Sequence, residues 1–413
     1  MSLLPVEQAQ SRLLQTARPI IDIEHLSLHD CDGRVLADNM EARLTQPPFD
    51  ASAMDGYALK AANAAEPGAV LRVVGESAAG HGFGGVVGEG EAVRIFTGAP
   101  VPAGADAVLL QEDAENLDGK RIRTTFPVTL GRHIRPYGQD FRQGDIALNA
   151  GTVVDFTRIT LAAAMNHASL PVYRRPRVAI IATGDELVSP GGQPGPSQII
   201  GSNTFGIAAL ARAIGADVID LGIVPDDRIM ITNAIAQAQT AKADVVVTLG
   251  GASVGDHDLV QSTLLAAGMT LDFWKIAMRP GKPLMVGSLG STHVLGLPGN
   301  PVSSMVCGLL FLEPLLAKLG HRPSPDRMTT ARLGAPLAAN DRRQDYLRAR
   351  LSRNAAGELQ VESFGKQDSS MMNIFAQSDC LIVRPPHAPE MGIGALCPIL
   401  MLRPFIGQGP ISA

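Results

Sequence analysis

The chain has 413 residues, more than a single hydrophobic core usually organises, so we expect about two to four domains. Its 46% hydrophobic and 18% charged residues are typical of a globular protein and exclude a chain that is disordered throughout. A net charge of −5 argues against nonspecific binding of nucleic acid, and the four widely spaced cysteines, without a CxxC pair, indicate neither a zinc site nor a disulfide framework.

The first third of the chain predicts one helix followed by a β-rich module. Residues 5–17 begin with a proline and continue with strong helix formers, so we expect an N-terminal helix. No basic segment precedes a long apolar stretch there, and no run of about 18 apolar residues is found, so we expect a cytoplasmic protein without a membrane segment. From Thr45 to about Asp140, short β-branched runs alternate with Gly and Pro, a pattern typical of strands. The GxGxxG match at residues 80–85 follows no clear strand and precedes no helix, so we interpret it as a loop.

Residues 176–320 alternate between apolar, strand-like segments and helix-like segments. Strands are expected at 177–183, 216–224 and 243–250, each followed by a helix, near 202–215, 227–242 and 257–267. A long apolar helix from Pro301 to Leu319 closes the segment. Repeated βα units of this kind predict a parallel sheet that helices cover on both faces. After His321 a short linker leads into alternating apolar and polar positions, which predict a small β-barrel or sandwich.

Polar loops follow the expected strands of this α/β domain. They are residues 183–186, 225–228, 250–258, 279–283 and 298–301. Ligands of open parallel sheets lie beyond the carboxyl ends of the strands, so the five loops should surround one pocket. A single loop of this kind is more often a helix cap, but five together favour a binding site.

The residue types in these loops point to an anionic ligand. Glycines such as Gly250 and Gly251 let backbone amides approach an anion closely. Basic side chains near one strand end suit phosphate or oxyanion binding, although a solvated face is the alternative; they are Lys275, Arg279 and Lys282.

Acidic side chains reach the same rim from separate loops, namely Glu186, Asp227 and Asp258. Beside an anionic substrate each would be repelled by about 4 kcal/mol at about 4 Å with an effective dielectric of about 20, unless a cation intervenes. We therefore expect Mg²⁺, which prefers oxygen ligands and substrate phosphates. For Asp226 and Asp256, a helix cap or a surface acid remains a plausible interpretation.

Six ordered motifs together closely resemble the molybdopterin molybdenumtransferase family, which includes bacterial MoeA, the E domain of plant Cnx proteins and gephyrin. The likeness covers nearly the whole chain. The motifs are PPFDASAMDGYAL (47–59), RIFTGAPVPAGADAVLLQED (94–113), ATGDELV (182–188), TLGGASVGDHD (248–258), MRPGKPL (278–284) and GLPGNPVS (296–303).

The resemblance implies a multidomain fold of α/β and β parts, with a central parallel α/β domain similar to molybdopterin adenylyltransferases, a β-rich inserted domain and a C-terminal β-barrel-like domain. It also implies a homodimer with a site shared between subunits, and leaves room for contacts with other proteins of cofactor biosynthesis. The implied parts are an N-terminal helix packed on the central domain (1–26), a small discontinuous domain (27–44 and 140–175), the inserted domain (45–139), the molybdopterin-binding domain (176–322) and the C-terminal domain (323–413).

The reaction implied by the resemblance inserts molybdate into adenylylated molybdopterin, with Mg²⁺-dependent release of AMP, as the final step of molybdenum cofactor biosynthesis. The family's catalytic residues match Asp55, Thr97, Asp140, Glu186, Asp227, Asp258, Lys275 and Arg279. Of these, Glu186, Asp227 and Asp258 are the expected metal ligands. The expected substrate-binding residues are Gly250, Gly251, Ser253, Lys282, Pro298, Asn300, Pro301, Arg348 and Ser369. For Asp55 alone, a turn-forming Asp-Gly is an alternative of similar weight.

Three positions depart from the family pattern. Leu249 stands where serine is common and so removes a hydroxyl, Arg279 replaces a usual lysine, and Gln139 replaces a usual glutamate. Arg279 keeps the charge but replaces a point charge with a planar fork. Two rival functions remain: adenylyl transfer to molybdopterin, which the central domain alone would also suit, and a scaffold role like that of gephyrin.

Overall fold

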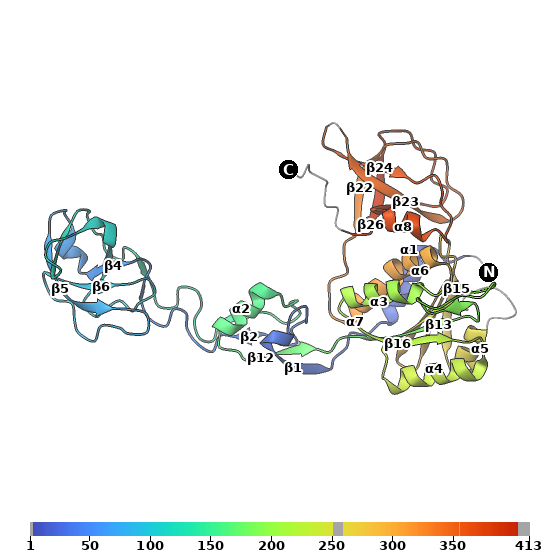
Figure 1. Ribbon diagram of the computed structural model, residues 1–413, viewed down its shortest axis with the longest axis horizontal. Coiled ribbons are helices and arrows are strands. Elements are labelled where there is room, and N and C mark those ends of the chain that lie inside the picture. Colours follow the sequence, from blue (N-terminus) through green and yellow to red (C-terminus); the bar gives the residue numbers. More distant parts are fainter. Residues whose placement is uncertain (1–2, 251–258, 355, 404–413) are drawn as a thin grey trace. The chain divides into compact units, whose positions relative to one another are not determined.

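The computed structural model describes residues 3–250, 259–354 and 356–403 of the chain. They form two compact units, which are considered separately here (Figure 1). The first unit combines Met1–Glu24 with Tyr173–Ala413, and the second is His25–Val172.

A six-stranded sheet in the order β16-β13-β17-β21-β20-β18 forms the centre of the first unit. The strands are β13 (Arg177–Thr183), β16 (Asp217–Val224), β17 (Val245–Leu249), β18 (Thr270–Lys275), β20 (Pro283–Leu289) and β21 (Thr292–Leu297). The four strands from β16 to β21 pair in parallel, which confirms the expected α/β sheet. The sheet is not wholly parallel, because β20 is antiparallel to both neighbours. Only Gly290 and Ser291 separate β20 from β21, and so short a connection forms a hairpin, not a crossover.

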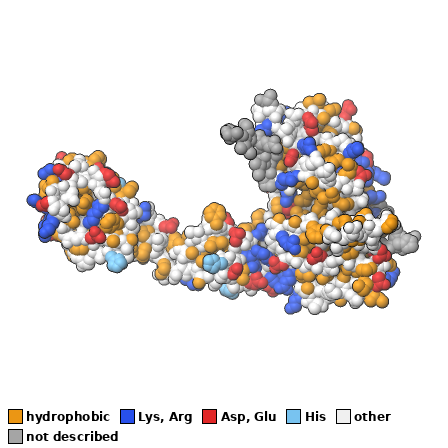
Figure 2. Space-filling model, in the orientation of Figure 1, with side chains coloured by type: hydrophobic (Ala, Val, Ile, Leu, Met, Phe, Trp, Pro, Cys, Tyr) orange, Lys and Arg blue, Asp and Glu red, His pale blue; other side chains and the backbone are white. Residues whose placement is uncertain are grey.

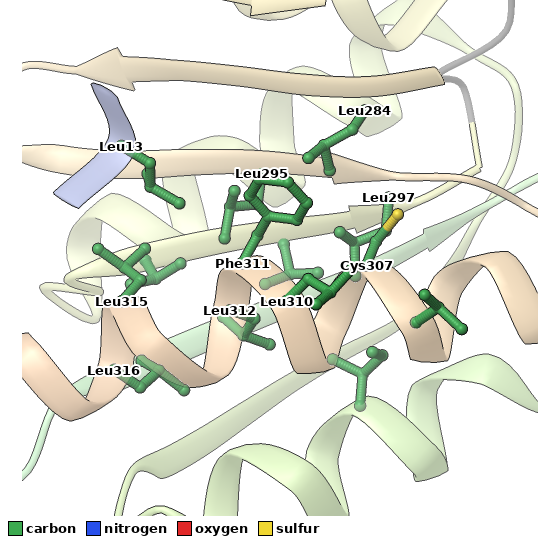
Figure 3. Packing of buried hydrophobic residues seen from close by; sticks show 14 of the residues in the cluster. Leu13, Leu284, Leu295, Leu297, Cys307, Leu310, Phe311, Leu312, Leu315 and Leu316 are labelled. Carbon is green, nitrogen blue, oxygen red and sulfur yellow. The ribbon is translucent and has the colours of Figure 1, made fainter. Parts of the chain in front are cut away.

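Helices cover both faces of this sheet. Side chains of β13 alternate between two apolar clusters: Ile180 belongs to one, and Ile181 to the other. The first cluster includes residues of α1 (Val6–Thr16), α3 (Asn203–Ala213), α6 (Pro301–Cys307), the π-helical turn η4 (Gly308–Leu312) and α7 (Glu313–Leu319). The second includes residues of α4 (Arg228–Thr240) and α5 (Leu259–Ala266). Figure 3 shows Phe311, Leu312 and Leu315 among the side chains that fill the first cluster.

The continuous helix Pro301–Leu319, which was expected as a long apolar helix, is long and apolar enough to cross a membrane by length and composition. However, 83% of this stretch is buried inside the protein. Its apolar side chains pack against the strands, as Figure 3 illustrates for Leu295 and Leu310. Its composition is therefore that of a core helix in an α/β domain.

The C-terminal part of the first unit is a closed barrel. Strands run in the order β23-β24-β22-β26-β25, and pairing of β25 with β23 closes the circle, which confirms the expected barrel. The strands are β22 (Met328–Leu333), β23 (Gln344–Arg353), β24 (Leu359–Ser363), β25 (Cys380–Arg384) and β26 (Leu396–Met401), with the short helix α8 at Met372–Gln377. One strand from the α/β part, β19 (Met278–Arg279), pairs in parallel with β23 and joins the two parts.

The second unit contains a curled six-stranded sheet in the order β7-β4-β6-β5-β9-β8. These strands are β4 (Gly56–Leu59), β5 (Val70–Ser77), β6 (Glu91–Ile95), β7 (Ala107–Leu110), β8 (Ala114–Asn116) and β9 (Arg121–Thr124). Between β5 and β6, the Gly80–Gly85 stretch forms a loop, as expected. Figure 2 shows basic and acidic side chains interspersed over the drawn face of this sheet.

A separate core within the second unit brings together residues 31–42 and 141–172. It includes Leu36, Phe141 and Met165, and helix α2 (Phe156–Ala164) packs onto it. The short strands around it are β1 (Ile23–Ser27) with β12 (Ser169–Tyr173), β2 (Met40–Glu41) with β11 (Ile146–Leu148), and β3 (Ala51–Ser52) with β10 (Ile134–Arg135). The five predicted domains divide the chain more finely than the two compact units, and their boundaries stay predictions.

Candidate active site

A cavity of about 760 Å³ opens at the carboxyl ends of the parallel strands. Thr183 at the end of β13, Leu249 at the end of β17 and Pro298 just beyond β21 line it. The paired strands β14 (Leu187–Val188) and β15 (Ile199–Ile200) and the first residues of α3 complete the wall. The rule that ligands lie beyond the ends of parallel strands therefore predicts the position of this cavity.

Five of the predicted site residues line this cavity, namely Glu186, Gly250, Pro298, Asn300 and Pro301. They come from three of the five loops singled out in the sequence. Three further predicted residues, Gly251, Ser253 and Asp258, lie outside the described residues.

Gly250 occupies a position that needs glycine. Its φ is +100°, in the region that L side chains rarely adopt, and an added Cβ would lie 2.7 Å from the carbonyl oxygen of Thr183. The backbone of β17 therefore turns sharply against the end of β13. Gly250 therefore lines the cavity with backbone atoms alone, and its role in binding an anion stays a prediction.

Acidic side chains gather at the cavity rim, and one of them was not among the predicted site residues. Asp226 lines the cavity with Glu186. Its backbone N–H donates to Asp185 Oδ1 at 3.1 Å. Partial burial raises the pKa of Asp226, and the negative charges of Asp185 and Glu186 raise it further. Desolvation is the larger cause of the raised pKa, and the smaller effect of Asp185 and Glu186 reflects three carboxylates near one another at this rim.

The neighbouring Asp227 has a different local role. It is the N-cap of α4, and its Oδ1 accepts hydrogen bonds from the backbone N–H groups of Ile229 and Met230, both at 2.9 Å. Asp227 is not among the described residues that line the cavity. The expected role of Asp227 as a metal ligand stays a prediction, beside an observed role in capping the helix.

Replacement of Asp227 by Ala should destabilise the protein by about 1 kcal/mol, because two helix N–H groups lose their acceptor. The Asp227→Asn variant should keep most of the stability, since asparagine caps helices about as well as aspartate. Urea unfolding followed by circular dichroism measures both. Equal stability of the alanine variant and the wild type would contradict the capping role.

The C-terminal barrel reaches the cavity through the loop 367–370. Arg348, only 1% exposed on β23, donates through Nε to Gln367 Oε1 at 3.0 Å and through Nη1 to the carbonyl oxygen of Asp368 at 2.6 Å. Burial lowers the pKa of Arg348. The next residue, Ser369, accepts a bond from Asn300 Nδ2 through its hydroxyl at 3.0 Å, and Ser370 lines the cavity. Arg348 thus holds the loop that meets the predicted residue Asn300.

The three predicted basic residues are not among the described residues that line the cavity. Lys275 Nζ lies 4.6 Å from the centroid of the Trp274 ring, and Lys282 is exposed. Arg279 instead contacts two carboxylates, Asp341 and Asp345. Their role in binding phosphate stays a prediction, and for Arg279 the described partners are acids of the barrel.

In the second unit, Asp55 and Thr97 lie together although 42 residues separate them. Asp55 Oδ1 accepts bonds from the backbone N–H of Thr97 at 2.7 Å and from its hydroxyl at 2.8 Å. Both bonds lower the pKa of Asp55, because they stabilise the carboxylate. Next to Thr97, Gly98 lines a hollow of about 470 Å³ together with Asp140 and Gln139. The predicted residues of the second unit therefore lie around one small region of its surface.

Within the described residues, no three His, Cys, Asp or Glu side chains converge closely enough to hold a metal ion by themselves. Magnesium, however, is commonly bound by one or two carboxylates together with substrate phosphates and water. The acidic rim with Glu186 and Asp226 fits that mode of binding.

Comparisons with known proteins point to one family in each of three segments of the chain. The MoeA N-terminal region (domain I and II) matches residues 4–166, the probable molybdopterin binding domain matches 179–318, and the MoeA C-terminal region (domain IV) matches 330–402. A molybdopterin molybdenumtransferase of Haemophilus influenzae is 35% identical over 397 residues, which are 95% of this chain and 97% of that protein. The chain belongs to the molybdopterin molybdenumtransferase family.

Other relatives support the same assignment. Molybdopterin molybdenumtransferase 2 of Mycobacterium tuberculosis is 34% identical and covers 94% of this chain and 96% of its own length. The crystal structure of a molybdopterin biosynthesis MoeA protein from Pyrococcus horikosii matches with a TM-score of 0.81 and 28% identity over 98% of this chain and all of that one. The family resemblance, the multidomain fold class and the assignment as a transferase of molybdenum cofactor biosynthesis are thereby confirmed.

Proposed function

We propose that this transferase inserts molybdate into adenylylated molybdopterin and releases AMP in a Mg²⁺-dependent reaction. The observation that carries the proposal is the strand-end cavity, in which an acidic rim with Glu186 and Asp226 faces the loop around Asn300 and Ser370. A phosphate-bearing substrate beside carboxylates requires a cation, and a loop tied to a buried arginine suits a second, oxyanionic substrate. Both substrates of the proposed reaction are anions.

The proposed magnesium ligands are Glu186 and Asp226, with Asp227 and Asp258 as the further acids predicted from the sequence. Bound there, Mg²⁺ would neutralise charge on the phosphoryl group that links AMP to molybdopterin. The protein's own residues position the substrates. The backbone at Gly250 approaches the phosphate, and Arg348 holds the loop with Ser369 beside Asn300. No covalent intermediate with the enzyme is needed.

The remaining predicted residues have proposed roles in the same reaction. Lys275 and Lys282 would attract the phosphates, while Pro298 and Pro301 shape the wall of the cavity. We further propose a cytoplasmic homodimer in which the region around Asp55, Thr97 and Asp140 completes the site of the partner subunit. The hydrogen bonds of Asp55 with Thr97 support only the grouping of these residues at one place in the second unit.

The test uses the purified full-length chain with adenylylated molybdopterin, molybdate and Mg²⁺. We expect AMP and molybdenum cofactor to form in equal amounts, and EDTA to stop both. Consumption of ATP with free molybdopterin, without any turnover of the adenylylated substrate, would instead identify an adenylyltransferase and overturn the proposal.

A further inference from the structure

Arg279 connects the α/β part of the first unit to its barrel. It lies on β19, beside Asp345 of β23 in parallel register. Its Nη1 lies 3.2 Å from Asp341 Oδ2, and its Nη2 contacts the Asp345 carboxylate and lies 3.5 Å from Asn340 Oδ1. The planar fork of a guanidinium reaches several acceptors at once, which a lysine ammonium at this position would not do in the same geometry.

Asp345 depends on this contact. Its side chain is 5% exposed, and its Oδ1 has no hydrogen-bond partner among the described residues. Burial of a carboxylate is costly unless a cation compensates it. The hydrogen bond that the described structure gives its other oxygen comes from Arg279. The guanidinium is therefore engaged in balancing a buried charge, and is not held ready for a phosphate.

Strand β23 connects this pair to a second arginine. Three residues after Asp345 it carries Arg348, whose guanidinium fixes Gln367 and Asp368. The loop that follows is bonded to the α/β part at two points: the hydroxyl of Ser369 accepts a bond from Asn300, and its carbonyl oxygen accepts one from the N–H of Val302 at 3.1 Å. Strand β23 and the loop that Arg348 holds thus connect the Arg279–Asp345 pair to Ser370 in the cavity wall.

We propose that Arg279 and Asp345 form an interdomain clamp that positions the loop 367–370 at the cavity, so that Asp345 is a positioning residue of the transferase. The reaction that the clamp serves rests on the proposed function, whereas the clamp itself rests on the contacts described above. In this proposal Arg279 does not make the contact with a substrate phosphate that the sequence led us to expect. It contacts Asp345 and acts on the site through β23.

The test compares Arg279→Gln, Asp345→Asn and the double variant in the full-length protein. Hydrogen–deuterium exchange is measured for residues 364–371, and KM and kcat are measured for molybdate and for adenylylated molybdopterin. We expect faster exchange in both single variants and a KM for molybdate raised about 2- to 30-fold, with kcat less affected. Because both residues act through one contact, the double variant should be no worse than the more impaired single variant.

The matched control is Arg332→Gln, which removes a half-exposed ion pair with Glu358 inside the barrel. It should leave exchange and KM unchanged. Unchanged exchange and KM in Asp345→Asn, together with a raised KM for the adenylylated substrate in Arg279→Gln, would identify Arg279 as a substrate ligand and overturn the clamp.

Two further outcomes are also decisive. If Asp345→Asn does not fold, Arg279→Lys replaces it: this variant keeps the charge but loses the fork, and should show exchange between that of the wild type and Arg279→Gln. Wild-type exchange in Arg279→Lys and Arg279→Gln alike would then overturn the clamp. If the wild type itself shows no turnover, the proposed function fails, while the exchange data still decide whether the clamp exists.

Discussion

Glu186→Gln and Asp226→Asn should each lower the rate of AMP release by about 10²- to 10³-fold, the loss seen when a preorganised electrostatic contact to the transition state is removed. Both side chains line the strand-end cavity, and both substitutions remove a charge while keeping the shape. Single-turnover release of AMP, measured across a range of Mg²⁺ concentrations, tests this. If the acids bind the cation, raising Mg²⁺ should restore part of the activity.

The substitutions should hardly affect folding, because both residues are largely exposed and Asp226 is only partly desolvated. Glu358→Gln provides the control, since it neutralises an exposed acid of the barrel that pairs with Arg332. Asp227→Asn and Asp258→Asn extend the series to the other predicted metal ligands. Unimpaired release of AMP and formation of cofactor in the variants at 186, 226, 227 and 258 would refute a magnesium site at this rim.

The position of the cavity could be predicted because it depends on strand order alone. Segments such as Arg177–Thr183 and Val245–Leu249 are apolar enough to be recognised as buried strands, and parallel strands bring their following loops to one edge. The antiparallel β20 was harder to anticipate. In the sequence, only the short turn at Gly290 distinguishes β20 from its neighbours. Such a turn is easily overlooked where strand-like and helix-like segments alternate.

The choice between Asp226 and Asp227 could not be made from the sequence. Both residues follow the same strand and carry the same charge. The difference arises from backbone geometry: Asp227 has extended torsions that direct its carboxylate to the first amides of α4, whereas Asp226 is left beside Asp185. A preference of aspartate for N-caps predicts that one of the two caps the helix, but not which one.

The roles of Arg279 and Arg348 were hidden for another reason. Their main partners, Asp345 and Asp368, lie 66 and 20 residues away. Asp345 comes close to Arg279 only when β23 pairs with β19, and Asp368 comes close to Arg348 only when the barrel folds. A charged residue in such a sequence motif is compatible with ligand binding and equally with an ion pair. Only the tertiary structure shows that one arginine is almost fully buried and the other compensates a buried acid.

Mixing two inactive variants should restore activity if the site is shared between subunits. Asp55→Asn alters the second unit, where Thr97 holds the carboxylate, and Glu186→Gln alters the strand-end cavity of the first. In the proposed homodimer, random exchange of subunits makes about half of the dimers mixed, and each mixed dimer contains one site without either substitution. About a quarter of the wild-type activity should then return.

The measurement is AMP release after mild unfolding and joint refolding of the two variants, compared with each variant treated alone. The double variant Asp55→Asn/Glu186→Gln, mixed with wild type, is the matched control. Its mixed dimers carry both substitutions on one chain and therefore damage both shared sites. If Asp55 and Glu186 served the same subunit, this control would keep one intact site in each mixed dimer, whereas the mixture of single variants would stay inactive. With equal amounts of the two chains, a site between subunits predicts about a quarter of the wild-type activity in both samples, in the control from its wild-type homodimers, whereas a site within one subunit predicts about half in the control and none in the mixture of single variants.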